Sequence, residues 1–153
     1  HVMKSFGDWV RRLSNEMPII QSFDLVDVIE DAMDRRGIDW GMEVSPSIPL
    51  VIGNKEYAQY VLGGLVSLIK QATGKTPATV KILHGPEGMV YVTMTAGQET
   101  VKDLRMLSEE FYGGLGLMAA RYLLTMMQAH LDLDYGAGAA LKLTFVSEKT
   151  KGL

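Results

Sequence analysis

The sequence predicts one α+β domain, a two-layer α/β sandwich in which helices cover one face of a mixed, mostly antiparallel sheet. Two pairs of short alternating segments, each joined by a turn that contains glycine, predict antiparallel hairpins. Amphipathic helical segments stand ahead of these hairpins and between them, so the sheet has helices to cover it on one face. A length of 153 residues suits a single hydrophobic core.

The helices are predicted from apolar residues that recur at a period near 3.6. Asp24 is a suitable N-cap for a helix over 25–36, and Gly37 is expected to end it. The strongest signal is a helix over 55–73, which Gly74 terminates. Its apolar stripe consists of Val61, Leu65, Leu68, Ile69 and Ala72.

The strands are predicted from alternation and from turn residues. Val90, Val92 and Met94 alternate with polar or aromatic neighbours, which predicts one buried and one wetter face. In order, we expect a helix over 6–16, a helix over 25–36, a strand over 38–44, an extended segment over 50–52, a helix over 55–73, strands over 79–84 and 89–95, helices over 101–111 and 117–129, and strands over 130–135 and 140–146.

Composition excludes several classes of site. The chain has no cysteine, so it has neither a disulfide framework nor a Cys-based zinc site. The net charge is −3 and no basic stretch is present, which argues against nucleic acid as a partner. No apolar run reaches the roughly 20 residues that a membrane span needs. We expect a cytoplasmic module of a longer protein whose membrane or sensor parts, if any, lie outside this sequence.

Several motifs, taken in order, resemble the catalytic ATP-binding domain of sensor histidine kinases, which shares its fold with gyrase and MutL-type ATPases. The resemblance covers roughly residues 22–148 and implies that 1–21 is the tail of a dimerisation helix or a linker and 149–153 a tail. The matching segments are Phe23-Asp24-Leu25, Ile48-Pro49-Leu50-Val51-Ile52-Gly53-Asn54, Gly114-Leu115-Gly116-Leu117, Ala129-His130, Gly136-Ala137-Gly138 and Leu141-Lys142-Leu143.

The resemblance also locates a first departure from the family. Family members carry two asparagines four residues apart on the long helix, and the second holds Mg²⁺ against the nucleotide. Gly64 and Leu68 stand at these positions here. Mg²⁺ requires oxygen ligands, which leucine lacks. Ser67 is one residue away, about 100° round the helix, and is a poor substitute.

Two further departures follow from the same resemblance. Thr95 stands where the family has the aspartate that accepts a hydrogen bond from adenine, followed by Gly97 and then by Glu99 in place of a second glycine. Only fifteen residues separate Gly97 from Gly113, and most are expected in the helix over 101–111, so the lid over the triphosphate is missing. The sequence therefore predicts no catalytic residue, no metal ligand and no required cofactor.

The degenerate nucleotide-site positions are Gly64, Leu68, Thr95, Gly97, Gly114, Gly116, Leu117, Gly136 and Gly138. The glycines of the box over 113–117 could still bind an anion at a helix N-terminus. The alternative is that they only allow tight turns, and we favour it. Neither His84 nor His130 has a second ligand at metal spacing.

The leading hypothesis is a degenerate histidine-kinase ATPase-like domain that acts in two-component signalling by protein contact, without phosphotransfer. Its partners would be a histidine kinase, a response regulator or its own dimerisation helices, with a homodimer possible in the full-length protein. The first alternative is an active sensor kinase that binds ATP, with or without Mg²⁺, through a divergent site. The second is a different small ligand in the emptied pocket.

Overall fold

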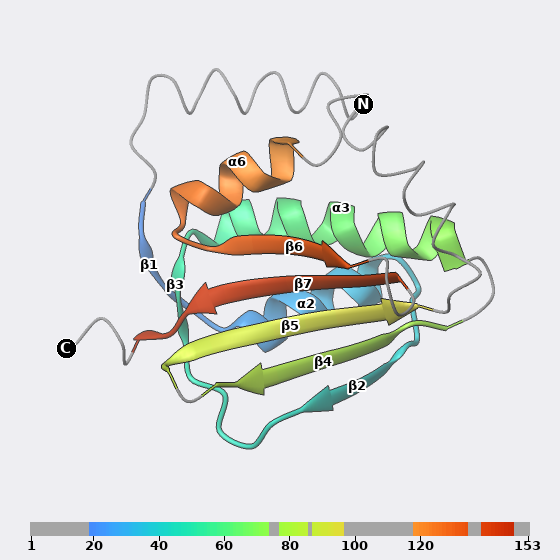
Figure 1. The fold of residues 1–153 in the computed structure, drawn as a ribbon, viewed down its shortest axis with the longest axis horizontal. Helices are drawn as coiled ribbons and strands as arrows, with labels where there is room; N and C mark the ends of the chain where they lie inside the picture. Colours follow the sequence, from blue (N-terminus) through green and yellow to red (C-terminus); the bar gives the residue numbers. More distant parts are fainter. Residues whose placement is uncertain (1–18, 74–76, 86, 97–117, 135–138, 149–153) are drawn as a thin grey trace.

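The computed structural model describes residues 19–73, 77–85, 87–96, 118–134 and 139–148. These residues form a helical layer on one face of a sheet, with a small second sheet at one end (Figure 1). The elements in order are β1 (Gln21–Phe23), α2 (Leu25–Arg35), β2 (Gly41–Val44), β3 (Val51–Gly53), α3 (Lys55–Thr73), β4 (Thr79–His84), β5 (Met89–Ala96), α6 (Met118–Met126), β6 (His130–Asp134) and β7 (Ala139–Val146).

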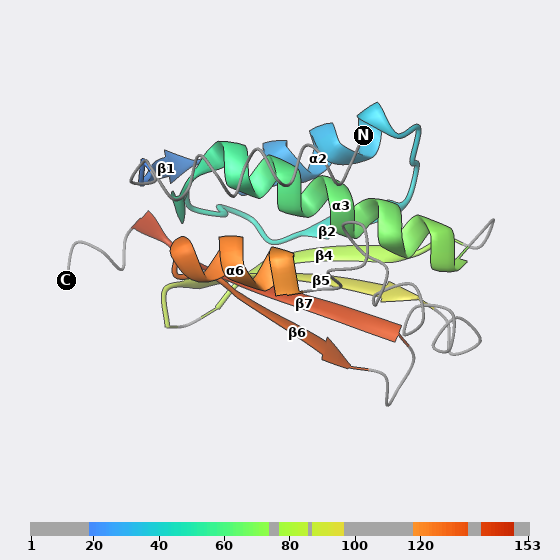
Figure 2. The same ribbon diagram turned by 90° about the horizontal axis from the view of Figure 1, so that it is seen from above.

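The main sheet has five strands in the order β2-β4-β5-β7-β6. The pair β2 and β4 is parallel, and the other three pairs are antiparallel. Helices α2, α3 and α6 lie on one side of this sheet, as Figure 2 shows. The predicted fold, a mixed and mostly antiparallel sheet with helices on one face, is confirmed.

Helix α2 begins and ends close to the predicted residues. The Asp24 carboxylate accepts a hydrogen bond from the Asp27 backbone N–H at 3.1 Å, so Asp24 is the N-cap. Gly37 adopts a φ of 64°, the left-handed conformation that glycine accepts without steric cost. The helix ends at Arg35, one residue earlier than predicted, and Arg36 is its C-cap.

The core lies between the helices and the sheet. Helix α3 has the predicted bounds, and Val61, Leu65 and Ile69 are fully buried beneath it. In β5 the side chains alternate as predicted. The buried members of this core that are largest and least exposed are Phe145, Leu25, Ile29, Leu62, Leu65, Ile69, Ile82, Met94, Leu123, Leu124 and Met127.

Two predicted elements are shorter than expected, and one strand was not predicted. The predicted strand over 38–44 begins only at Gly41, and the helix predicted over 117–129 is helical over Met118–Met126 in the described part. The sequence reading also missed β1, which pairs antiparallel with β3. The helices expected over 6–16 and 101–111, and the turn at Gly136-Ala137-Gly138, lie outside the described residues.

Helix α6 ends in a Schellman motif. The Ala129 N–H donates to Leu124 O at 2.8 Å and the Gln128 N–H donates to Thr125 O at 3.0 Å. Gln128 is the left-handed residue of this motif, with a φ of 60°. The helix ends at Met126 because the chain turns into this left-handed conformation two residues later. A residue other than glycine is sterically strained in that conformation.

Replacing Gln128 with glycine is therefore expected to raise the free energy of unfolding by about 0.5–1 kcal/mol. Urea denaturation of the purified domain measures this change. The matched control is Gln59→Gly, which places the same substitution on an exposed position inside α3 and should lower stability by about 1 kcal/mol. A loss of stability in Gln128→Gly would contradict the strain assigned to that residue.

Candidate nucleotide-site region

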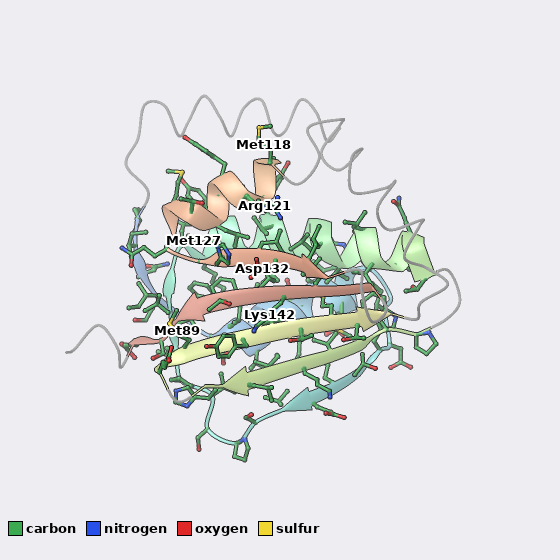
Figure 3. The ribbon with its side chains drawn as sticks, viewed as in Figure 1. Met89, Met118, Arg121, Met127, Asp132 and Lys142 are labelled. Atoms are coloured by element: carbon green, nitrogen blue, oxygen red, sulfur yellow. The ribbon has the colours of Figure 1, made fainter. Side chains whose placement is uncertain are left out.

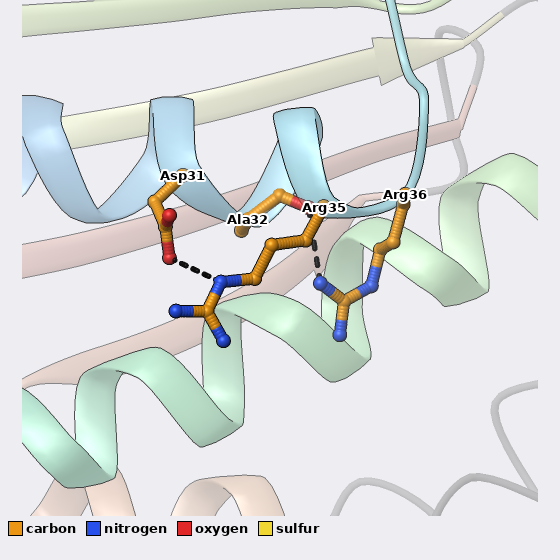
Figure 4. Close-up of polar contacts among 4 residues, drawn as sticks. All are labelled: Asp31, Ala32, Arg35 and Arg36. Atoms are coloured by element: carbon orange, nitrogen blue, oxygen red, sulfur yellow. Dashed lines mark hydrogen bonds and ion pairs between the residues drawn. The ribbon is translucent and has the colours of Figure 1, made fainter.

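The C-terminal end of α2 is fixed to α3 by the half-buried side chain of Arg36. Its Nε donates a hydrogen bond to Ser67 Oγ at 2.7 Å, and its Nη1 donates to Ala32 O at 3.0 Å. Figure 4 shows the second of these contacts beside the exposed ion pair of Arg35 with Asp31. Lys70 Nζ donates to Arg36 O at 2.9 Å. These bonds connect the two helices through one residue.

Gly63 provides the space for this contact. A Cβ atom at position 63 would lie 2.6 Å from Arg36 Nη2 and 3.2 Å from Arg36 Cζ. Such distances are well below van der Waals contact, so the guanidinium group could not stay where it is. A side chain at position 63 is therefore incompatible with the observed packing of Arg36 on α3.

Ser67 takes part in the same contact. Its hydroxyl donates to Gly63 O at 3.0 Å and accepts from Arg36. Leu68, the next residue, points into the core and is 3 % exposed. Gly64 is half-buried on the same helix. The two positions matched to the family's asparagines are therefore a glycine, which has no side chain, and a buried leucine. The nearby Ser67 hydroxyl points toward α2.

Thr95 lies on the opposite face of the sheet from Leu68. Val90, Val92 and Met94 of β5 point to the helical layer and are fully buried. Thr95 alternates with these residues in the same strand, so its exposed side chain lies on the face opposite the described helices. The structure thus separates these two predicted site residues. On the face toward the helices, the described side chains of β5 supply no hydrogen-bond acceptor.

The remaining site residues expected from the sequence, Gly97, Gly114, Gly116, Leu117, Gly136 and Gly138, lie outside the described residues.

One residue of this region was not singled out from the sequence. Tyr60 is half-buried on α3, four residues before Gly64 and so on the same side of the helix. Burial raises the pKa of the Tyr60 phenol above its ordinary value, because the charged form is less well solvated there. The sequence could have indicated Tyr60, because it stands four residues before Gly64, a predicted site position.

The face of the sheet opposite the described helices is mainly polar. Lys142 lies with its Nζ 4.8 Å from the ring centroid of Tyr91, a cation–π contact, and it stands opposite Asp132 in the register of β6 and β7 (Figure 3). His130 Nε2 lies 3.2 Å from Asp132 Oδ1, and both side chains are exposed. Within the described ranges, no group of three or more His, Asp or Glu residues is arranged to hold a metal ion.

The Arg36 contact can be tested by a double-mutant cycle. In the native background, Gly63→Ala is expected to lower the free energy of unfolding by about 1 kcal/mol, because the Arg36 hydrogen bonds are displaced. In an Arg36→Ala background the same change should raise it by about 0.5–1 kcal/mol, because alanine has the higher helix propensity. Urea unfolding of the four variants measures the coupling. Equal effects of Gly63→Ala in both backgrounds would contradict the contact.

Comparison with solved structures identifies the fold. Over 84% of this chain and 98% of the other, the fold matches the mycobacterial sensor histidine kinase MprB at 16% identity and a TM-score of 0.62. The nucleotide-free catalytic domain of the histidine kinase ThkA matches at 17% identity, over 84% of this chain and 96% of that one, with a TM-score of 0.62.

A third match is full-length ShkA in complex with AMPPNP, at 16% identity and a TM-score of 0.57. It covers 84% of this chain and 30% of that one, so the shared domain is one part of a larger protein there. No family model and no curated protein matches the sequence. The chain has the histidine-kinase ATPase-like fold, and among its described helices none is long and apolar enough to cross a membrane.

Proposed function

We propose that this chain is a degenerate histidine-kinase ATPase-like domain that acts in two-component signalling through protein contact, without ATP hydrolysis or phosphotransfer. Its partner would be a histidine kinase, a response regulator or the dimerisation helices of its own full-length protein. The fold is that of catalytic domains, while Leu68, at the described position expected to hold Mg²⁺, is packed in the core. The proposal rests on the second of these observations.

The observation that carries the proposal is the burial of Leu68. The family position that supplies an oxygen to Mg²⁺ is here a leucine that is 3 % exposed and packed in the core. An aliphatic side chain cannot replace a hard oxygen ligand. Leu68 also contributes to the packing of the core. The position therefore has a structural role and offers no ligand to a metal ion.

The neighbouring oxygen is equally unsuited to a metal. Ser67 Oγ accepts a hydrogen bond from a guanidinium group at 2.7 Å, and a cation held next to Arg36 would be repelled by it. To serve as a ligand, Ser67 would have to release both Arg36 and Gly63 O. This contact supports the absence of a magnesium site on α3.

The adenine end of the site offers a third line of support. On the face of β5 toward the helices, the described side chains are the apolar Val90, Val92 and Met94. An adenine amino group placed there would lose its hydrogen bonds to water without gaining a side-chain acceptor from this strand, which costs about 1–3 kcal/mol. Thr95, which has a hydroxyl, faces the other way.

An active kinase is the alternative function, and the likeness to ShkA favours it because that protein is in complex with AMPPNP. Under this alternative the chain would bind ATP through a divergent site, with Mg²⁺ coordinated by other groups or absent. The two functions differ in one measurable property, the affinity of the domain for a nucleotide.

Isothermal titration of the domain with ATP and AMPPNP, each with and without Mg²⁺, separates them. We expect no binding tighter than about 1 mM, which corresponds to about −4.1 kcal/mol. Dissociation constants in the micromolar range would refute the proposal and support the kinase. Native mass spectrometry of the same sample would reveal a copurified molecule if another small ligand occupies the region.

Partner binding is tested separately with the full-length protein. Co-purification with a cognate histidine kinase or response regulator, unaffected by removal of nucleotide, is the expected result. Autophosphorylation of the full-length protein with labelled ATP would contradict the proposed lack of phosphotransfer.

A further inference from the structure

The side chain of Asn54 joins two separate parts of the chain. Its Oδ1 accepts a hydrogen bond from the Tyr57 backbone N–H at 3.0 Å, and its backbone carbonyl accepts from the Ala58 N–H at 2.9 Å, so Asn54 is the N-cap of α3. Its Nδ2 donates to Ile19 O at 2.9 Å. The two partners fix the orientation of the amide, because an N–H can only donate and a carbonyl oxygen can only accept.

Ile19 belongs to the segment that leads into β1. Figure 1 shows β1 beside β3 at one end of the domain, and the last residue of β3, Gly53, stands directly before Asn54. The Ser22 hydroxyl of β1 also donates to Glu148 Oε1 at 3.0 Å, so β1 is bonded to the residues that follow β7 as well. The first described residues are therefore tied both to the small sheet and to the cap of α3.

Strand β1 is suited to exist in a paired and a detached state. It has three residues, of which only Phe23 is buried, and among the described strands it pairs with β3 alone. A short strand with few apolar contacts opens locally at a low free energy. When β1 detaches, Ile19 O leaves Asn54 and the amide loses the bond that holds its orientation. The bond from the Tyr57 N–H is then less well aligned.

We propose that Asn54 relays the state of β1 to α3. While β1 is paired, the amide is held in its capping orientation, and when β1 detaches, the first turn of α3 opens more often. Such coupling requires a two-state element whose equilibrium both sites bias, and β1 is that element. Helix α3 carries Gly64 and Leu68, so a displacement of the chain ahead of Ile19 would reach the helix of the candidate site. The relay is independent of whether the domain binds a nucleotide.

Asn54→Asp separates the two hydrogen bonds of this side chain. Aspartate accepts from the Tyr57 N–H and its charge is favourable at a helix N-terminus, but it has no N–H to donate to Ile19 O. Hydrogen exchange of the full chain, followed amide by amide by NMR, is the measurement. We expect the β1 amides to exchange about two- to tenfold faster and the Tyr57 amide to exchange no faster than in the native protein. Asn54→Ala, which removes both bonds, should accelerate both.

Phe23→Ala tests the relay itself, because it loosens β1 and leaves Asn54 unchanged. In the native background it should make the Tyr57 amide exchange about two- to fivefold faster. In the Asn54→Asp background it should have no such effect, since the carboxylate is no longer bonded to Ile19 O. Glu148→Ala releases the Ser22 hydroxyl at an exposed site and should give the same pattern at a smaller size in a protein whose core is intact.

The matched control is Glu43→Ala, which removes another exposed carboxylate, the partner of Lys81 at the far border of the main sheet. It should leave Tyr57 exchange unchanged in both backgrounds. Equal acceleration by Phe23→Ala in both backgrounds would overturn the proposal, because the signal would then travel through packing against Gly53. Unchanged Tyr57 exchange in Phe23→Ala and Glu148→Ala, or unchanged β1 exchange in Asn54→Asp, would overturn it as well.

Discussion

Leu68→Asn is expected to lower the free energy of unfolding by about 3–4 kcal/mol and to restore no nucleotide binding. The substitution introduces the amide that the family position requires, but Leu68 is 3 % exposed in the core. Burying an amide there removes apolar contacts and leaves polar atoms without water. The buried environment that stabilises leucine at this position therefore destabilises a side chain that could bind Mg²⁺.

Urea denaturation gives the stability of this variant, and titration with Mg-ATP gives its affinity. Leu68→Met is the matched control, since it conserves volume and polarity and should cost less than about 1.5 kcal/mol. A Leu68→Asn protein as stable as the native chain would show that the position is not a core site. Binding of Mg-ATP with micromolar affinity would show that one residue separates this chain from an active site.

Phe145→Ala is expected to have an effect of similar size, about 3–5 kcal/mol. Phe145 is fully buried in β7, and its ring meets Phe23 edge to face with centroids 6.4 Å apart. This contact, together with the bridge between Val51 and Ser147, connects the small sheet to the main one. Loss of the ring should loosen β1 and β3 first.

Chemical denaturation measures the global change, and hydrogen exchange of the β1 and β3 amides measures the local one. Val146→Ala is the control, because Val146 is the next residue of β7, half-buried on the other face of the sheet. It should cost less than Phe145→Ala and leave exchange in β1 and β3 unchanged. Uniform exchange rates across both sheets in Phe145→Ala would contradict a connecting role for this ring.

Most of the fold followed from local patterns in the sequence. The apolar stripe of α3 and the cap at Asp24 depend only on neighbouring residues, and both were located correctly. The alternation in β5 predicted its buried face. The strand β1 was missed because three residues carry almost no periodic signal, and its pairing with β3 links positions about thirty residues apart.

The candidate site could be predicted only in part. That Ser67 would not replace an asparagine followed from helix geometry, and the structure places its hydroxyl against α2. The involvement of Arg36 and Gly63 depends on how two helices cross, which the sequence did not reveal. For Thr95 the signal was present. Its alternation with Met94 already placed it on the wetter face of the sheet, and the structure shows it exposed there.

The single parallel pairing has a consequence for local motion. Strand β2 has four residues, lies at the sheet's border and is bonded to β4 alone. Three of those four residues are exposed, so few apolar contacts resist its detachment. We therefore expect β2 to detach transiently from β4 while β4, β5 and β7 stay paired. Local unfolding of the main sheet should begin at this edge.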